Sequence, residues 1–294
     1  MSPYETWNEP SKMAKLVSIW EGVTHTATRP TVSVVIPALN EARNLPHVAA
    51  CMPNDVDEIV FVNGASVDDT AEVARELWPD AVHVSQTRKG KGNALACGIL
   101  ASSSDIIVLI DADCSTDPRE IPRFVSALIS GADFAKGSRF IQGGGSADIT
   151  FLRRLGNWGL NALVNMLFAT KYTDLCYGYN ALWRHCIDVI RLPDVAATEP
   201  QWGDGFEIET LINVRVAANR LKIAEVCSYE ASRIYGVSNL NAVKDGLRVL
   251  KTIRQEFAYT RQVTSSERAD RPLAAVRPLT VEQPVVFGGP EPAA

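Results

Sequence analysis

The chain has 294 residues, 46% of them hydrophobic and 21% charged, which is the composition of a soluble globular protein with one large domain or two modest ones. Its formal net charge of −5 argues against a general nucleic-acid-binding protein, because such proteins carry a basic face. The six cysteines are scattered without a C-x-x-C pair, which favours free thiols in a reducing compartment and argues against a zinc site.

The first 30 residues are predicted to form an extension before the folded domain. Met13, Leu16, Val17 and Trp20 recur at helical spacing, which predicts a short amphipathic helix. Residues 1–10 lack the apolar segment of a signal peptide, and no window has the roughly 18 apolar residues that a membrane span needs. A cytoplasmic location is therefore expected.

Strands are predicted to alternate with helices from residue 31 onward. This rhythm is typical of βαβ units with right-handed crossovers. The fold class is therefore predicted to be α/β, with a Rossmann-like, mainly parallel central sheet flanked by helices. The strands are expected at 32–37, 58–63, 81–84, 106–110 and 134–138, and the helices at 44–52, 70–77, before 101, and at 118–130.

Polar side chains follow three of these strands at the point where each strand ends. Asn40 and Glu41 follow the first strand, residues 63–69 include and follow the end of the second, and Asp111 and Asp113 follow the strand at 106–110. In an open α/β sheet, ligands bind just beyond the carboxyl ends of the strands. We therefore expect the three clusters to form one site.

The pair of acids at this edge predicts a bound cation. Two like charges as close as Asp111 and Asp113 repel unless a cation or hydrogen-bond donors lie between them. A hard divalent cation that carries phosphates would satisfy both carboxylates and keep several of its own waters. The alternative is one solvated carboxylate and one that caps the next turn.

A basic, glycine-containing loop precedes the helix that ends near residue 101. Lys89-Gly90-Lys91-Gly92 offers ammonium groups, glycine amides and a helix N-terminus, all of which suit a diphosphate. Gly137-Ser138-Arg139, at the end of the next strand, adds a further cation to the same edge. The alternatives are a solvated turn for the loop and a surface salt bridge for the arginine.

The pattern changes after Gly143-Gly144-Gly145, a glycine-rich loop. Residues 151–170 are apolar with interspersed arginines and asparagines, and they are predicted to form one amphipathic helix or two. The remaining expected elements are a strand to 183, a helix to about 190, a helix opened by residues 202–209 and ending near 219, strands at 222–226 and 229–234, and a helix at 239–258.

Four ordered motifs resemble the family 2 glycosyltransferases, which have the GT-A fold, in the branch that includes dolichyl- and polyprenyl-phosphate mannose synthases. The likeness covers about residues 32–257. It implies a metal-dependent transferase that moves a sugar from a UDP- or GDP-sugar to an acceptor hydroxyl or phosphate, with inversion. The motifs are Val34–Glu41, Asp68-Asp69-Thr70, Lys89–Ala94 and Asp111-Ala112-Asp113.

The resemblance also divides the chain. Residues 31–259 would form the GT-A domain, with a nucleotide-sugar-binding half at 31–140 and an acceptor half of mixed strands and helices at 141–259. The proline-containing residues 260–294 show little periodicity, which predicts a disordered tail.

On the same resemblance, Asp113 would hold Mg²⁺ or Mn²⁺ on the diphosphate, together with Asp111, which would also contact the sugar or ribose. The nucleotide-sugar side would comprise Pro37, Ala38, Asn40 and Glu41 around the nucleobase and ribose, together with Asn63, Asp68, Lys89, Lys91, Gly92, Asp111, Ala112 and Arg139.

Two positions depart from the family pattern. Asn63 stands where many relatives carry an aspartate that would meet the nucleobase, so the nucleotide preference stays open. Tyr235, which follows Arg233 in a recurrent stretch, stands where relatives often have a histidine that can bind the metal. Because a neutral phenol is a poor replacement, Asp113, phosphate oxygens and water would have to hold the cation.

Inverting transfer to a hydroxyl needs a carboxylate that takes the acceptor proton. Asp204, Glu207 and Glu209 are the candidates, and the last two point to different sides of a helix, so at most one faces the site. By resemblance to the acidic motif of the family, Asp204 or Glu207 is predicted to be the base. The alternative for Asp204 is a capping box with Glu207, and a phosphate acceptor would need no base.

The acceptor side is predicted to include Arg153, Arg154, Arg233 and Tyr235. In polyprenyl-phosphate transferases the region that corresponds to residues 151–168 lies against the membrane. The leucines of 151–168 could therefore contact lipid while its arginines bind phosphate. The predicted partners are a nucleotide sugar and a small-molecule or polyprenyl-phosphate acceptor, with at most peripheral membrane contact and no nucleic acid. The alternative for this helix is an ordinary core or homodimer helix.

Two competing functions are a nucleotidyltransferase that makes a nucleotide-sugar and a non-catalytic module that binds one. A nucleotidyltransferase should have a glycine-rich loop with arginine after its first strand, and Pro37–Glu41 does not supply it. A binding module has no need for both the Asp111/Asp113 pair and the Asp204/Glu207 pair. The glycosyltransferase is therefore the favoured interpretation.

Overall fold

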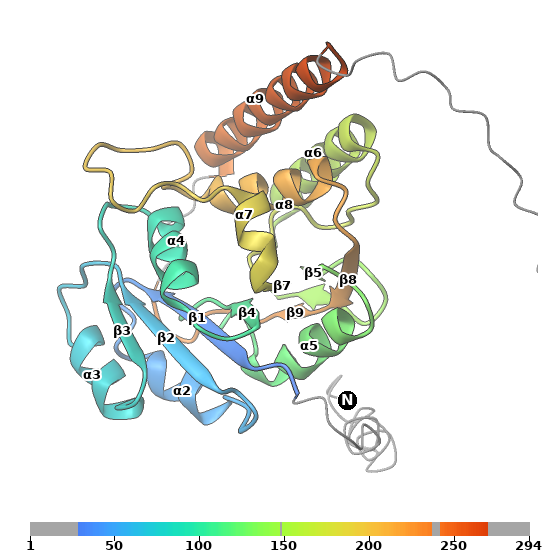
Figure 1. Cartoon of the computed structure of the whole chain (residues 1–294). Coiled ribbons are helices and arrows are strands. Elements are labelled where there is room, and N and C mark those ends of the chain that lie inside the picture. The colour runs from blue at the N-terminus through green and yellow to red at the C-terminus, as the bar shows by residue number, and fades with distance from the viewer. Residues whose placement is uncertain (1–28, 148, 237–241, 270–294) are drawn as a thin grey trace, which may run out of the picture.

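The computed structural model of the chain describes residues 29–147, 149–236 and 242–269. A seven-stranded sheet with the strand order β3-β2-β1-β4-β7-β5-β8 forms its centre (Figure 1). The helix predicted near residues 13–20 and most of the predicted tail lie outside the described residues. The seven strands are β1 (Val32–Ala38), β2 (Glu58–Asn63), β3 (Val82–Ser85), β4 (Ile106–Leu109), β5 (Phe134–Ser138), β7 (Asn180–Trp183) and β8 (Ile223–Cys227).

The sheet is mainly parallel, as the alternation of strands and helices predicts. The pairs β1–β2, β1–β4, β2–β3 and β5–β8 are parallel, whereas β7 runs antiparallel to both β4 and β5. Because β7 lies between β4 and β5, the two predicted halves of the chain share one sheet. Side chains from both halves of the chain therefore meet at one edge of this sheet.

A two-stranded sheet pairs β6 (Gly145–Ser146) with β9 (Tyr229–Glu230). The sequence predicts a longer strand at 229–234, and that prediction is wrong. After Glu230 the backbone N–H of Ala231 donates to the carbonyl oxygen of Ser115 instead of a strand neighbour. This contact brings the segment that follows β9 to the turn after Asp113.

Helices cover both faces of the sheet in two layers, and a third layer lies outside them (Figure 1). On one face lie α2 (Leu45–Ala50), α3 (Thr70–Leu77) and, after the 3₁₀ turn η1 (Pro118–Glu120), α5 (Ile121–Ile129). On the other lie α4 (Lys91–Ala101), α8 (Ile208–Ala218) and, after η2 (Arg184–Cys186), α7 (Ile187–Ile190). The outer helices α6 (Phe151–Phe168) and α9 (Ala242–Ala269) pack against α8.

The central strands are apolar on both faces because both faces are covered. Val34 and Ile36 of β1 pack with the cluster that includes α2, α3 and α5, and Val35 packs with α4 and α8. All three side chains are fully buried. Continuous apolar runs of this kind are typical of parallel strands in α/β proteins.

The two outer helices settle two open expectations. Residues 151–168 form one helix, α6, rather than two. The helix α9 continues to Ala269, beyond the predicted end at residue 258, so the predicted domain limit at 259 falls within a helix.

We expect Gly98→Ala to destabilise the protein, because a Cβ at Gly98 would lie 2.4 Å from Val35 Cγ1 and 2.8 Å from Val62 Cγ2. Overpacking a core costs about 1–3 kcal/mol, which should outweigh the better helix propensity of alanine. The control is Gly156→Ala on exposed α6, where a Cβ meets nothing within 4 Å and stability should rise by about 1 kcal/mol. Thermal unfolding measures both. Equal effects of the two substitutions would contradict this packing.

Candidate functional site

The carboxyl ends of β1, β2 and β4 meet at one edge of the sheet, as predicted. Asn40 and Asp68 lie in the loops that follow β1 and β2, Asn63 is the last residue of β2, and the three side chains shape these loops. Each accepts a hydrogen bond from a backbone N–H: Asn40 from Val67 (2.8 Å), Asn63 from Ser66 (3.0 Å) and Asp68 from Thr70 (3.2 Å).

Two of the small residues predicted beside the nucleotide have buried side chains. Ala38 is 4% exposed at the end of β1, and Ala112 is 3% exposed between the two aspartates. Pro37 is paired with Val62 within the sheet rather than ending β1. Ala38 and Ala112 can therefore border a ligand mainly through their backbone.

Asp111 and Asp113 each form an ion pair with a basic side chain of the chain itself. Asp113 is 4% exposed; its Oδ1 accepts from the backbone N–H of Ser115 (2.9 Å) and its Oδ2 lies 2.7 Å from Arg233 Nη2. Asp111 Oδ1 lies 2.7 Å from Lys91 Nζ. The two cations supply the positive charge that this pair of acids requires.

Glu41 belongs to the same electrostatic cluster. Burial chiefly raises the pKa of Glu41, and the nearby charges of Asp113 and Asp111 raise it further, against the opposing hydrogen bond from Asn44. Asn44 also exchanges hydrogen bonds with the backbone of Tyr235, both at 3.2 Å. The segment that carries Arg233 is thereby fixed to the turn after β1.

The aromatic ring of Tyr235 lies over Arg43, with 3.8 Å between the guanidinium carbon and the ring centroid. Its ring centroid is 6.1 Å from that of His47. Tyr235 therefore packs on the turn that leads into α2.

A pocket of about 60 Å³, here called the central pocket, lies beside Asp111. Four basic residues line it: Lys91, Arg139, Arg153 and Arg233. Its carboxylates are Asp111, Glu209 and Glu230, and each is ion-paired, to Lys91, Lys91 and Arg139 respectively.

Three of the predicted arginines line this pocket and one does not. Arg139 is 5% exposed and lies between Asp174 (2.7 Å) and Glu230 (2.9 Å). Arg154 is exposed, with its guanidinium 5.7 Å from the ring centroid of Phe140. Lys89 is also exposed and does not line the pocket.

Asp204, one of the two predicted bases, lies in a buried ion pair outside the central pocket. Both of its oxygens accept from Arg88, at 2.9 and 2.8 Å, and Oδ2 also accepts from the N–H of Gln201 at 2.7 Å. Burial raises the pKa of Asp204, but the bonds from Arg88 and Gln201 outweigh burial and lower it. A carboxylate stabilised in this way is a poor proton acceptor.

Glu207, the other predicted base, is 1% exposed and also does not line the central pocket. Its Oε1 accepts from the backbone N–H groups of Gly203 (3.1 Å) and Gly205 (3.4 Å), so it organises the loop before α8. The helix begins at Ile208 without a side-chain cap, so the capping-box alternative is wrong. Glu209, two residues on, is the acid of this helix that faces the pocket.

The reason predicted for the glycines of the basic loop is also wrong. The N–H of Gly92 donates to the carbonyl oxygen of Asp204 (2.8 Å), and a Cβ at Gly92 would lie 1.8 Å from the carbonyl oxygen of Gly203. A Cβ at Gly90 would lie 2.0 Å from the Asp204 oxygen. The two glycines therefore permit close contact with the protein's own backbone, and the Gly92 amide is already paired.

Of the pocket residues from the second half of the chain, the sequence predicted Arg153 and Arg233 and missed most of the others. Glu209 was weighed and not favoured, and Tyr177, Gly178 and Glu230 were not considered. The available signal was that Glu207 and Glu209 point to different sides of a helix. It indicates that at most one of them faces the site, but it does not identify which one.

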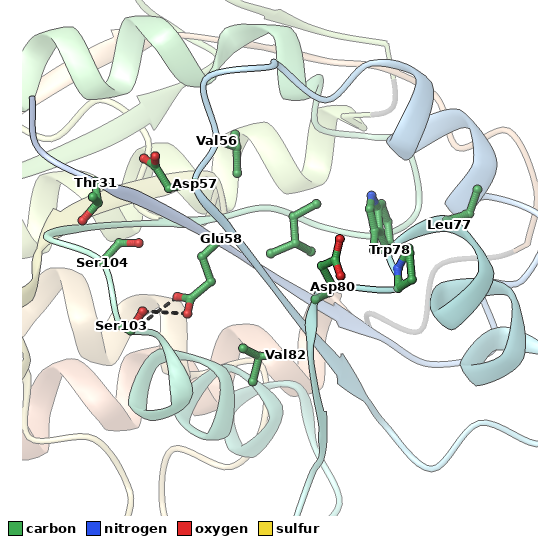
Figure 2. Close-up of a pocket in the computed structure, with 13 residues that line it drawn as sticks. Thr31, Val56, Asp57, Glu58, Leu77, Trp78, Asp80, Val82, Ser103 and Ser104 are labelled. Atoms are coloured by element: carbon green, nitrogen blue, oxygen red, sulfur yellow. Dashed lines mark hydrogen bonds between the residues drawn. The ribbon is translucent and has the colours of Figure 1, made fainter.

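A larger hollow of about 550 Å³ lies at the opposite edge, at the amino-terminal ends of β2 and β3 (Figure 2). Three carboxylates line it, and two of them are already satisfied: Asp57 pairs with Arg29 at 2.7 Å, and Glu58 accepts from Ser103 at 2.7 and 2.8 Å. Because ligands of such sheets bind at the carboxyl ends of the strands, the central pocket and the Asp111/Asp113 pair are the candidate functional site.

Comparison with known proteins points to sugar transfer. Residues 33–188 match the profile described as glycosyl transferase family 2. The chain is 31% identical over 242 residues to a dolichol-phosphate mannosyltransferase of Pyrococcus furiosus, covering 79% of this chain but only 62% of that enzyme. It is 31% identical over 225 residues to a polyprenol monophosphomannose synthase of Mycolicibacterium smegmatis, covering 72% and 83%.

Solved structures share the fold. A glucosyl-3-phosphoglycerate synthase of Mycobacterium tuberculosis, in complex with phosphoglyceric acid, superposes with a TM-score of 0.62 at 24% identity, covering 84% of each chain. The same synthase with Mn²⁺, uridine diphosphate and glucosyl-3-phosphoglycerate gives a TM-score of 0.60 at 23% identity. At this level of identity the likeness concerns the fold alone.

Proposed function

The chain belongs to glycosyl transferase family 2 and is a glycosyltransferase of GT-A fold, and from that premise we propose that it transfers a sugar from a UDP- or GDP-sugar to a phosphate-bearing acceptor with the help of Mg²⁺ or Mn²⁺. In this transfer an acceptor phosphate oxygen bonds to the anomeric carbon, the bond from that carbon to the diphosphate breaks, and the nucleoside diphosphate leaves. Attack opposite the leaving group would invert the configuration.

Asp113 and Asp111 would hold the metal. Hard divalent cations take oxygen ligands, and Mg²⁺ is commonly bound by one or two carboxylates together with substrate phosphates. Asp113 Oδ1 is fixed by the N–H of Ser115, which leaves Oδ2 as the oxygen that can change partner. The metal would stabilise negative charge on the departing diphosphate.

We expect Arg233→Ala to strengthen binding of Mn²⁺ to the nucleotide-free protein by about three- to tenfold. The Arg233 guanidinium occupies Asp113 Oδ2 at 2.7 Å with 29% of its side chain exposed, so the pair is moderately strong and competes directly with a cation. Calorimetric titration with Mn²⁺ measures the change. The control is Arg43→Ala, because the Arg43 guanidinium lies on Tyr235 and not on a carboxylate of the metal site. The competition would be contradicted if Mn²⁺ bound more tightly to the control, or if it bound no more tightly to Arg233→Ala than to the wild type.

A phosphate-bearing acceptor is proposed because of how the central pocket is charged. Among the residues that line it, four basic side chains outnumber three carboxylates, and all three carboxylates are ion-paired, which makes them weak proton acceptors. An acceptor phosphate is already anionic and needs no base. This pairing is the observation that carries the proposal, and it replaces the roles predicted for Asp204 and Glu207.

The acceptor is further proposed to be a polyprenyl phosphate. Arg153 of α6 lines the central pocket, and the exposed face of the same helix is mostly apolar, with Phe151, Leu155, Trp158 and Met166 between 53% and 80% exposed. Apolar side chains beside a phosphate site suit a lipid acceptor at a membrane surface, and the named relatives act on such lipids. None of the described helices combines the length and apolarity of a membrane span.

Transfer assays with matched acceptors test the proposal. The purified protein is incubated with Mn²⁺ and each of a panel of UDP- and GDP-sugars, with vesicles containing polyprenyl phosphate, vesicles without it, or soluble 3-phosphoglycerate. We expect glycosyl-lipid only with the polyprenyl phosphate and one class of donor. Transfer to the phosphate oxygen of 3-phosphoglycerate would retain the phosphate as nucleophile and overturn the lipid, and transfer to its hydroxyl would overturn both.

A further inference from the structure

Lys136, in β5, is a buried cation that the proposed chemistry does not use. It is fully buried, and its Nζ donates to the carbonyl oxygens of Tyr177 (2.6 Å) and Gly137 (3.0 Å). Among the residues described, no carboxylate forms an ion pair with it. Burial lowers the pKa of Lys136, against the attraction of Asp174. A buried ammonium without a paired carboxylate is costly unless the surrounding charges favour it.

The charges on either side of Lys136 are unbalanced in the direction that favours a cation. Lys91 lies between two carboxylates, Asp111 at 2.7 Å and Glu209 at 2.6 Å. Arg139 likewise lies between two, Asp174 at 2.7 Å and Glu230 at 2.9 Å. Each of these two ion clusters therefore has one more negative than positive charge.

Charges from both clusters influence the pKa of Lys136. The charged groups that act on it are Asp174 and Arg139 of one cluster, Glu209 of the other, and Glu225 of the neighbouring strand β8. Since three of these four are negative, the ammonium partly offsets an excess that would otherwise be buried beside the central pocket.

Lys136 also fixes the wall of the central pocket. Its hydrogen bond fastens the Tyr177 carbonyl, which belongs to the Tyr177–Gly178 peptide of that wall. Gly178 packs so closely that a Cβ would lie 2.6 Å from Glu209 Oε1 and 3.2 Å from Lys91 Nζ. A shift of this peptide would therefore displace the Lys91–Glu209 pair.

We propose that Lys136 is a positioning residue of the transfer site, whose buried charge partly offsets the negative excess of the two ion clusters and whose hydrogen bonds hold the Tyr177–Gly178 peptide against Glu209 and Lys91. The catalytic consequence rests on the proposed function. The charge balance does not, and it can be measured without any substrate.

A double-mutant cycle on stability tests the charge balance. Lys136→Met removes the ammonium with little change in length, and Glu209→Gln removes one negative charge. We expect Glu209→Gln to be less destabilising in the Lys136→Met background than in the wild type, by at least about fivefold in the unfolding equilibrium constant. If Lys136→Met alone does not fold, we expect the double variant to regain folded protein. Additive effects, or no recovery, would overturn the proposal.

The matched control is Glu58→Gln, a carboxylate at the opposite edge of the sheet that is bonded to Ser103. It should combine additively with Lys136→Met, because sites without shared partners usually do. Coupling as strong as that of Glu209→Gln would overturn the specific balance. Urea unfolding of the full chain, followed by circular dichroism, measures all the variants.

The kinetic readout separates positioning from stability alone. In Lys136→Met we expect the KM of the phosphate acceptor to rise by about tenfold and that of the nucleotide sugar to rise less, since the displaced wall lines the central pocket proposed for the acceptor phosphate. Tyr172→Phe, which loses a buried hydrogen bond to the Asn213 carbonyl, should leave both unchanged. Equal changes in Lys136→Met and Tyr172→Phe would overturn the positioning role, whereas absence of any transfer in the wild type would overturn the proposed function and leave the stability cycle as the test.

Discussion

Replacing Asp113 with asparagine is expected to lower kcat/KM by at least about 1000-fold while the protein stays folded. The substitution removes the negative charge that would hold the metal, and a metal at a departing diphosphate is worth several kcal/mol in the transition state. An asparagine oxygen can still accept from the N–H of Ser115, so the turn should survive. The lost ion pair with partly exposed Arg233 should cost little stability.

Transfer assays with saturating Mn²⁺, together with thermal unfolding, measure the effect. The control is Asp117→Asn, four residues on, whose carboxylate pairs with exposed Arg119 and should leave activity within about twofold of the wild type. Activity in Asp113→Asn comparable with that of the control would contradict the assignment of the metal site.

Replacing Asp204 with asparagine is expected to have the largest effect on stability. The substitution leaves Arg88, whose side chain is 5% exposed, without its bidentate partner, and breaking a buried ion pair costs about 3–5 kcal/mol. For a domain of this size the melting temperature should fall by roughly 10 °C. The folded variant should retain its kcat within about threefold, because Asp204 does not line the central pocket.

The pH dependence of this loss has a defined sign. The pKa of Asp204 is lowered on folding, from an ordinary value of 3.8, so its ionised form stabilises the native state above that pH. The difference in stability between the wild type and Asp204→Asn should be full at neutral pH and should shrink as the pH falls below 3.8 and through the lowered pKa. A stable variant without activity would instead support Asp204 as the catalytic base.

Several elements could be predicted from local sequence because their signals are local. The residue ranges predicted for β2, α3 and β5 agree with the structure, since each is an apolar or amphipathic run bounded by turn residues. The antiparallel direction of β7 could not be predicted in this way. A short apolar strand reads the same in both directions, and its pairing with β4 and β5 joins segments far apart in the chain.

The candidate site was predictable where its residues lie at the ends of consecutive parallel strands. The meeting of the loops after β1, β2 and β4 follows from the topology rule. The ion-pair role of Asp204 could not be predicted from local sequence, because its partner Arg88 lies 116 positions away. The glycines beside Lys91 were misread for the same reason: the backbone that fills their space comes from residues 203–204.

Calorimetric titration of UDP and of GDP into the wild-type protein, with and without Mn²⁺, tests most directly whether the edge at Asp111 and Asp113 binds a metal–diphosphate. The account predicts that one of the two nucleotides binds at least about tenfold more tightly with Mn²⁺. Metal-independent binding of both nucleotides, or binding of neither, would contradict it.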